Sequence, residues 1–299
     1  MAENGSSQVS KWFGLMSPGS LDASPPSVMV EAEFGARSQR GPRPVNDDHY
    51  LVLRMRRQQE IVMTSLAQAE LPACLDESGY GMVVADGIGG DGDTASRLAI
   101  SALMHLATYF GRWHVRIDEP IADEMVDRAK RFYRGVDATI RKASLQSPRG
   151  LQTTLTAAYT AGSDLFYAHV GHSRAYVFRD NQLMQLTRDH TVSHRHGSAV
   201  MVDVAGAARD THYIVTQALG WTGTGARRID VERCGLMDND VVLLCTNGLT
   251  DVADDARIAN ALRANHTPDA QCQALLDLAA NSGSTDDVTA LVGRYRISV

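Results

Sequence analysis

Four short segments rich in aspartate and asparagine are scattered along the chain. They comprise residues 46–48, 86–90, 246–251 and 284–289. Carboxylate and amide oxygens are the ligands that hard divalent cations such as Mg²⁺ prefer. Two such cations that share a water molecule can hydrolyse phosphate esters, because they activate the water and neutralise charge on the phosphoryl group. If the fold brings the four segments together, the sequence predicts a two-metal site of this kind.

The segments must be positioned by regular elements, and apolar periodicity predicts four helices. Apolar residues recur at spacings of three and four on one face, with charged residues on the other. The helices are expected over residues 94–111, 121–144, 254–264 and 268–281. The first is capped by Asp93 or Thr94.

Strand patterns account for most of the remaining chain and carry the acidic segments at their ends. Alternating or fully apolar runs predict strands over residues 28–35, 50–56, 81–86, 241–245 and 288–297, and an antiparallel meander over 153–187. The polar stretch 57–80 is interpreted as a hairpin or surface loop. With no internal repeat and no clear domain boundary, this order favours an α+β fold in which antiparallel sheets pack together with helices outside.

Composition narrows the function classes. The 299 residues carry a net charge of −6, which argues against a nucleic-acid binder. The four cysteines form no C-x-x-C pair, which argues against structural zinc and fits a reducing compartment. No apolar run approaches the roughly 20 residues that cross a bilayer, and no secretory signal is visible. We therefore expect a cytoplasmic protein without membrane contact, with a flexible segment over residues 1–30 and one domain over 31–299.

Eight segments in order resemble the motifs of the PPM family, the metal-dependent protein serine/threonine phosphatases of type 2C. The match runs from about residue 30 to 297. The pairs are Arg43–Asp48 with R-x-x-N-E-D, Asp86–Gly90 with D-G-M-G-G, Thr153–Leu155 with G-T-T-L, Gly171–Tyr176 with G-D-S-R-A-Y, Leu186–His190 with L-T-x-D-H, Thr216–Gly220 with T-R-A-L-G, Leu244–Asp251 with L-C-S-D-G-L-T-D, and Asp286–Thr289 with D-N-I-T. The resemblance implies a four-layer α-β-β-α sandwich, with two central antiparallel sheets flanked by helices.

The resemblance also implies roles for the acidic residues. Asp86 would bridge two metal ions, and Gly87 would offer its backbone carbonyl. Asp286 would hold the first ion. Asp47 and Asp48 would serve the second, directly or through water. An oxygen-only ligand set fits two Mn²⁺ or Mg²⁺ ions better than zinc.

The implied reaction is the hydrolysis of phosphoserine and phosphothreonine in proteins. A water shared by both ions would attack phosphorus directly, while the metals and Arg43 neutralise the developing charge. Arg43 would clamp the phosphate with its planar fork. Taken alone, Asp86 and Asp286 are typical of turns or helix caps, and Arg43 of a surface charge. Only the joint arrangement favours a catalytic site.

Three departures from the family pattern matter. Asn247 stands where a metal-binding aspartate is usual, so the first ion should bind more weakly. His172 replaces an aspartate that helps to hold an accessory third ion in some bacterial members, which predicts that this third site is absent or weak. Ile88 stands where many eukaryotic members have a histidine proposed as general acid. The leaving group would then take its proton from elsewhere, for example from metal-bound water, and His172 is an alternative donor.

The expected partners are phosphorylated proteins, in particular a bacterial-type serine/threonine kinase or its substrates, acted on by a monomer. Residues 189–216 correspond to a variable flap that could gate substrate. Two other hypotheses remain open. Asn247 and His172 motivate a catalytically impaired phosphatase fold that serves as a regulatory or phospho-binding module. The same site could also act on small phosphate esters.

Overall fold

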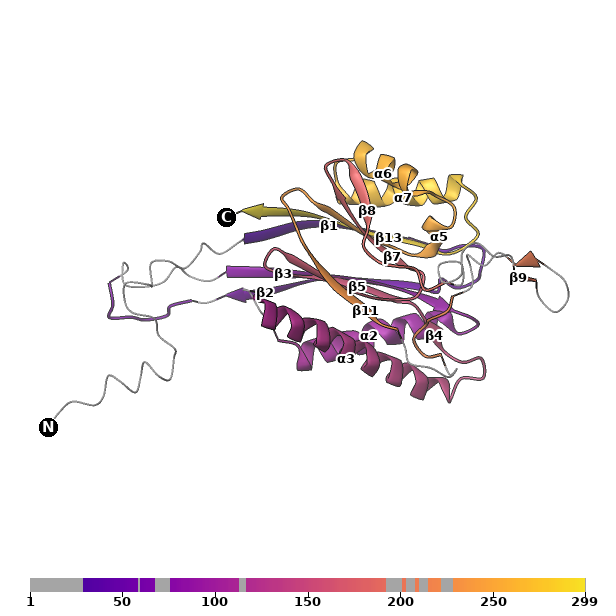
Figure 1. Ribbon diagram of the computed structural model, residues 1–299, viewed down its shortest axis with the longest axis horizontal. Helices are drawn as coiled ribbons and strands as arrows, with labels where there is room; N and C mark the ends of the chain where they lie inside the picture. The colour runs from indigo at the N-terminus through magenta and orange to yellow at the C-terminus, as the bar shows by residue number, and fades with distance from the viewer. Residues whose placement is uncertain are drawn as a thin grey trace.

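Two antiparallel sheets lie face to face in the computed structural model, and helices cover the outer face of each sheet (Figure 1). The structure describes residues 29–58, 60–67, 76–112, 117–191, 201–202, 208–209, 215–221 and 228–298. The segment predicted to be flexible, residues 1–30, lies outside the described residues except for Met29 and Val30. These two already belong to the first strand.

The first sheet has five antiparallel strands in the order β1-β13-β12-β7-β8. Their bounds are Met29–Gln39 for β1, Val288–Ser298 for β13, Val241–Cys245 for β12, Arg174–Arg179 for β7 and Gln182–Gln185 for β8. Strand β12 is apolar and completely buried, because it lies between two strands and is covered on both faces. The third acidic segment follows β12 and the fourth leads into β13, so both lie at one end of this sheet.

The second sheet follows the order β11-β6-β5-β3-β2, with the short strand β4 paired to β3. The bounds are Asp230–Gly235 for β11, Asp164–Val170 for β6, Leu155–Ala161 for β5, Asp76–Ile88 for β3, Asp48–Gln58 for β2 and Gln152–Thr153 for β4. Strands β9 (Met201–Val202) and β10 (Ala208–Arg209) form a separate pair. The first two acidic segments lie at one end of β2 and β3.

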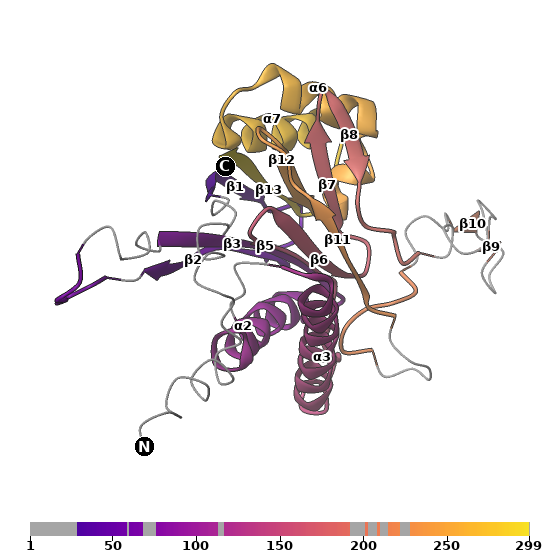
Figure 2. The same ribbon diagram turned by 60° about the vertical axis from the view of Figure 1, so that its left-hand side comes forward.

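Helices α2 (Gly92–Phe110) and α3 (Glu119–Ser144) lie against the second sheet, and α6 (Asp255–Ala264) and α7 (Pro268–Asn281) cover the first (Figure 2). The four-residue helix α5 (Asn247–Thr250) follows β12. Four of these helices match the predicted ones within two residues at each end. None of the described helices has the length and apolar character needed to cross a bilayer. The predicted four-layer sandwich is confirmed.

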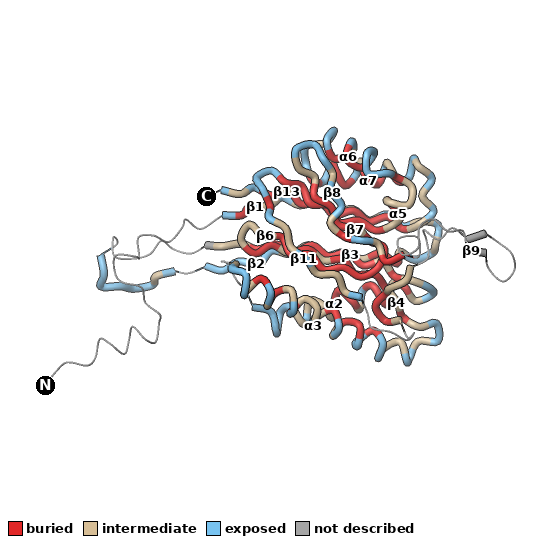
Figure 3. Tube along the Cα trace, in the orientation of Figure 1, coloured by how far each residue is buried: buried red, intermediate tan, exposed pale blue. Residues whose placement is uncertain are grey.

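The core has three main layers, and the buried stretches follow the strands (Figure 3). Met82, Val242 and Leu291 belong to the cluster between the two sheets. A second cluster lies between the first sheet and helices α6 and α7, and a third between the second sheet and helices α2 and α3. Packing on both sheet faces holds the strand ends in fixed positions, and these ends carry the acidic residues.

Two strand predictions need correction. The expected loop over residues 57–80 is shorter, because β2 extends to Gln58 and β3 begins at Asp76, with these two residues paired. Continuous pairing satisfies the backbone of both strands even where their side chains are polar. Strand β11, Asp230–Gly235, was not predicted. It pairs with β6 at the sheet edge, where its charged residues remain accessible to solvent.

Candidate metal centre

Asp48 and Asp86 are opposite each other on neighbouring strands, at the same end of the second sheet. They form a direct register pair between β2 and β3. Directly opposed residues of antiparallel strands project their side chains to the same face of the sheet. Two residues that are 38 positions apart in sequence are therefore brought together by strand pairing alone.

The backbone of Asp86 is fixed by the two threonines of the predicted strand start. The Asp86 amide donates to Thr154 Oγ1 at 3.0 Å, and its carbonyl accepts from Thr153 Oγ1 at 2.9 Å. The carboxylate itself accepts no hydrogen bond from a described residue. Burial, together with the nearby charges of Asp48 and Asp286, raises the pKa of Asp86 well above its ordinary value. The positive charge of Arg43 opposes this rise only in part, so the carboxylate is incompletely compensated.

Asp48 is buried, and only one of its two carboxylate oxygens accepts hydrogen bonds. Its Oδ2 accepts from Thr246 Oγ1 at 2.7 Å and from Thr289 Oγ1 at 2.8 Å. Its Oδ1 is buried without a hydrogen-bond partner. Burial raises the pKa of Asp48 to about 7, although the two threonine hydroxyls act in the opposite direction. An unpaired buried carboxylate oxygen is costly and calls for a cation or a proton.

Asp47 connects this strand pair to the start of helix α2. Its Oδ1 accepts the Asp93 amide at 2.8 Å, and its carbonyl accepts the amide of Gly87 at 3.0 Å. A negative charge at a helix N-terminus is favourable because the free amides and the helix dipole are positive there. Gly87 approaches Gly92 so closely that a Cβ on Gly87 would lie 2.1 Å from the Gly92 carbonyl oxygen. Only glycine permits this contact.

Asp286 enters from the other sheet, immediately before β13, and Arg43 holds it. Arg43 Nη2 lies 2.5 Å from Asp286 Oδ1 and 2.9 Å from Asp287 Oδ2, and Arg43 Nη1 lies 3.5 Å from Asp47 Oδ2. The guanidinium is thus surrounded by three carboxylates. It supplies positive charge to the group in this structure and lies within reach of the predicted metal ligands.

Asn247 presents its amide nitrogen, rather than its oxygen, to the acidic residues. Nδ2 donates to Asp251 Oδ2 at 3.0 Å and lies 3.4 Å from Asp286 Oδ2. This orientation follows from chemistry, because the amide oxygen would repel both carboxylates. Asn247 therefore joins the two aspartates as a hydrogen-bond donor.

His172 continues this line of contacts away from the centre. Its ring is buried, and Nε2 lies 3.6 Å from Asp251 Oδ1 and 3.4 Å from Asp189 Oδ2. Asp189 is also held by a bidentate contact from Arg174. His172 therefore lies between two carboxylates at the position predicted to weaken a third metal site.

The structure brings all the predicted site residues to one end of the sandwich. They are Arg43, Asp47, Asp48, Asp86, Gly87, Asn247 and Asp286. Among the described residues, no three His, Cys, Asp or Glu side chains converge closely enough to form a ready-made cation site. The carboxylates are spaced by Arg43 and Asn247 instead. We therefore expect these two side chains to move when ions bind.

Sequence reasoning missed the importance of Asp287. This residue is almost fully buried, and its carboxylate accepts the amides of Gly41 at 2.7 Å and Asp47 at 2.8 Å. It thereby fixes the loop that carries Arg43. Asp287 stands where the family motif has asparagine. This departure could have indicated from the sequence that the residue is important. A buried aspartate next to other acidic groups is costly unless specific groups donate hydrogen bonds to its carboxylate.

The donor set fits hard divalent cations. Every predicted ligand contains an oxygen that can bind a cation, although Asn247 would have to turn its amide. The Asp48 Oδ1 atom is unpaired, and the Asp86 carboxylate has no donor among the described residues. Asp47, Asp48, Asp86 and Asp286 together carry more negative charge than the single Arg43 can balance. Two divalent cations would supply the missing positive charge.

Comparisons with known proteins show similarity to phosphatases. A family model described as Protein phosphatase 2C matches residues 65–281. The serine/threonine protein phosphatase PstP of Mycobacterium tuberculosis is 30% identical over 216 residues, which are 71% of this chain and 39% of that protein. The serine/threonine phosphatase stp of Listeria welshimeri is 29% identical over 71% of this chain and 82% of its own length. The chain thus spans well under half of the mycobacterial relative.

Solved structures show the same fold. The catalytic domain of the phosphatase PstP, solved in complex with two manganese ions, superposes with a TM-score of 0.64 at 25% identity. The comparison covers 90% of this chain and 100% of that one. A crystal structure of the Mycobacterium tuberculosis phosphatase PstP/Ppp gives a TM-score of 0.64 at 27% identity, over 88% of this chain and 98% of the other.

Proposed function

Because this chain belongs to the protein phosphatase 2C family, we propose that it removes phosphate from phosphoserine and phosphothreonine residues of proteins. The observation that supports this most strongly is the convergence of Asp48, Asp86 and Asp286 from three strand ends beside Arg43. Metal-binding carboxylates next to an arginine are what a phosphate-ester hydrolase requires.

Two Mn²⁺ or Mg²⁺ ions would be held by Asp86, by the Gly87 carbonyl and by Asp286, with Asp47 and Asp48 serving the second ion. When bound, the ions supply an activated water nucleophile and positive charge for the phosphoryl group. Thr246 and Thr289 orient Asp48 by donating to its Oδ2, so that Oδ1 remains available. The chain thus contributes a set of oriented oxygens.

Arg43 would bind the phosphate. Its guanidinium is engaged with Asp286 and Asp287, and cations that neutralise the acidic residues would release it to face the substrate. Asp287 keeps the loop in place through the amides of Gly41 and Asp47, so only the Arg43 side chain has to turn. Its planar fork can then contact two phosphate oxygens.

Asn247 and His172 affect how tightly, and how many, metal ions the centre would bind. The Asn247 amide must rotate to offer its oxygen to an ion, so we propose that the first ion binds weakly. His172 already bridges Asp189 and Asp251, and we propose that no third ion binds there. Because its Nε2 faces these two carboxylates, direct proton donation by His172 to the leaving group is disfavoured.

We propose that the substrates are phosphorylated proteins, including a serine/threonine kinase or its targets, and that a cytoplasmic monomer acts on them. In this proposal, the chain from Met29, where β1 begins, forms one phosphatase domain.

A phosphopeptide assay tests the proposal. Purified protein with Mn²⁺ should release phosphate from a phosphothreonine peptide, and EDTA or Asp86→Ala should abolish release. Asp127→Ala is the matched control, because Asp127 is exposed on α3 in the outer helical layer. Partner binding without turnover in any divalent ion would instead support a regulatory module. Preference for free nucleotides over phosphopeptides would support a small-molecule phosphohydrolase.

A further inference from the structure

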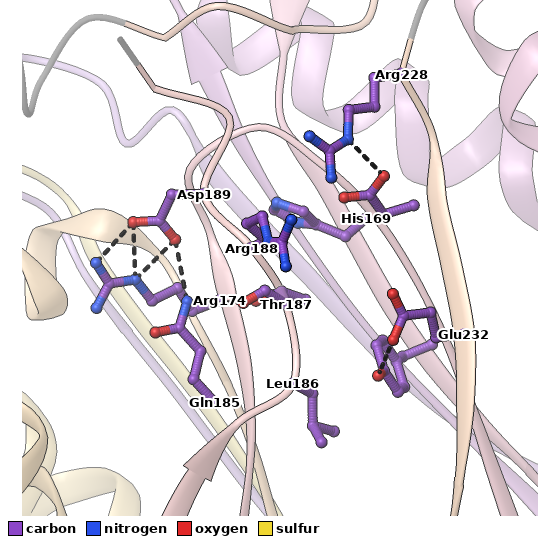
Figure 4. Close-up of a pocket in the computed structure, with 11 residues that line it drawn as sticks. His169, Arg174, Gln185, Leu186, Thr187, Arg188, Asp189, Arg228 and Glu232 are labelled. Carbon is purple, nitrogen blue, oxygen red and sulfur yellow. Dashed lines mark hydrogen bonds and ion pairs between the residues drawn. The ribbon is translucent and has the colours of Figure 1, made fainter. Parts of the chain in front are cut away.

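A second polar cavity, outside the metal centre, lies where the edges of the two sheets meet (Figure 4). Its volume is about 480 Å³. Strands β6 and β11 of the second sheet form one wall, and β7 with the loop after β8 forms the other. The residues that matter most are charged: Arg174, Arg188, Asp189, Arg228, Asp230 and Glu232.

Most of these charges are already paired. Arg174 binds Asp189 through Nε and Nη2, with distances between 2.7 and 3.1 Å. Asp230 accepts from Arg228 Nε at 2.8 Å and lies 3.2 Å from His190 Nε2. Both acidic partners therefore have little capacity left for a ligand.

The uncommitted groups are mainly donors. Arg188 is exposed and has no hydrogen-bond or ion-pair partner among the residues that the structure describes. Arg228 contacts Asp230 through its Nε, and its two terminal nitrogens have no partner among the described residues. On the acceptor side, Glu232 holds the Tyr167 hydroxyl at 3.0 Å. Two guanidinium groups with free N–H donors in one cavity match an anion with several oxygens.

The cavity is connected to the metal centre by a short line of side chains. Asp189 on the cavity wall is followed by His172, Asp251 and Asn247, with successive contacts of 3.4, 3.6 and 3.0 Å. Asn247 then lies 3.4 Å from Asp286. The carboxylates of Asp189 and Asp286 are thus at most roughly 16 Å apart, a span that about five extended residues cover at ~3.3 Å each.

We propose that this cavity is a docking site for a second phosphorylated side chain of the protein substrate, held by Arg188 and Arg228. The inference rests on the proposed phosphatase function. One phosphoresidue is hydrolysed at the metal centre, while another phosphate a few residues away binds the two arginines without reacting. The site therefore selects multiply phosphorylated segments, and its contribution appears in substrate binding.

The test compares two sets of phosphopeptides on the full chain with Mn²⁺. One set carries a single phosphothreonine, and the other carries an additional phosphoserine three to six residues away on either side. At least one doubly phosphorylated peptide should have a KM about tenfold lower than the single one, as expected when charge-assisted hydrogen bonds are gained. Arg188→Ala should remove this advantage and leave kcat unchanged.

Two controls separate this inference from the phosphatase function itself. Turnover of p-nitrophenyl phosphate should be the same in Arg188→Ala and wild type, because this substrate has one phosphate and cannot occupy the metal centre and the cavity together. Arg134→Ala, on the exposed face of α3, should keep the preference for the doubly phosphorylated peptide. If the wild-type protein does not hydrolyse p-nitrophenyl phosphate, the result contradicts the proposed phosphatase function and not the docking site.

The remaining outcomes identify the anion. If a glutamate in place of the second phosphoserine gives the same Arg188-dependent gain, the cavity is supported as an anion site that also accepts carboxylates. If wild-type KM values for single and double phosphopeptides are equal, the docking proposal is wrong. It is also wrong if Arg188→Ala raises KM equally for both sets, or if only free inorganic phosphate shows Arg188-dependent binding.

Discussion

At the scale of single residues, the centre is a set of carboxylates whose close placement is unfavourable without cations. Asp48 and Asp86 both have raised pKa values, because burial and neighbouring negative charges oppose their ionisation. Arg43 and Asn247 provide part of the compensation as a guanidinium and an amide donor. The metal-free protein should therefore be stabilised by removal of one charge.

We predict that Asp48→Asn stabilises the metal-free protein at pH 8. The pKa of Asp48 is about 7 in the folded state against an ordinary value of 3.8, so the folded state binds more protons between these two pH values. Wild-type stability that is present below pH 4 should decline as the pH rises through 7. Asparagine avoids this loss, which amounts to about 1–4 kcal/mol at pH 8.

Thermal melting in EDTA at pH 5 and pH 8 measures this effect. The melting temperature of Asp48→Asn should exceed that of wild type at pH 8, and the difference should shrink at pH 5. A constant difference at both pH values would show that Asp48 does not titrate in this range. The same variant should lose phosphatase activity, because the second ion loses a carboxylate.

Asn247→Asp should tighten the first metal ion. A carboxylate replaces an amide that faces Asp251 and Asp286 with its nitrogen, so the variant gains a charged ligand and loses a donor. We expect the Mn²⁺ concentration for half-maximal activity to fall about tenfold, and metal-free stability to fall as well. Unchanged metal dependence would exclude residue 247 as a ligand.

Some of these residues could be predicted from the sequence, and others could not. Asp86, Asp286 and Arg43 could be assigned because they occur in motifs whose order is informative. Asp287 and the hydroxyls of Thr246 and Thr289 could not, since their roles depend on hydrogen bonds across more than 40 residues of chain. The linear sequence does not show which buried oxygen lacks a hydrogen-bond donor.

At the scale of elements, the site depends on the register of β2 against β3 and on the close contact between Gly87 and helix α2. Antiparallel pairing places Asp48 opposite Asp86, and a shift by one residue would turn one of the two side chains to the other face of the sheet. Gly87 lies at the end of β3, where its amide donates to the Asp47 carbonyl. Strand, loop and helix N-terminus meet at this point.

Gly87→Ala should disrupt this junction. The added Cβ would lie 2.1 Å from the Gly92 carbonyl oxygen, a contact that backbone atoms cannot avoid without moving. We expect a loss of about 2–4 kcal/mol in the free energy of unfolding and weaker Mn²⁺ binding. Gly235→Ala at the end of β11 is the control, because a Cβ there meets no atom within 4 Å. Equal stability of the two variants would contradict the packing argument.

Element prediction succeeded where periodicity was strong. The helices 268–281 and 121–144 and the buried strand 241–245 agree closely with the structure, because one apolar face or one continuous apolar run defines each. The edge strand Asp230–Gly235 and the extension of β3 to Asp76 were missed. Their polar side chains carry no such signal, and pairing with a neighbouring strand decides their conformation.

At the scale of the whole molecule, both sheets contribute to one end of the sandwich. Asp48 and Asp86 come from the second sheet, while Asn247 follows β12 and Asp286 precedes β13 in the first. The apolar layer between the sheets fixes their distance, so cations bound at this end would link the two halves. Metal binding should therefore stabilise the complete fold by mass action.

Anomalous diffraction from crystals grown in Mn²⁺ tests the central claim most directly. We predict two anomalous peaks, about 3.5–4 Å apart, with the Asp86 carboxylate between them and Asp286 beside one of them. Arg43 should have turned away from Asp286. A structure in abundant Mn²⁺ without a peak next to Asp86, or with peaks only at unrelated surface carboxylates, would contradict the two-metal centre.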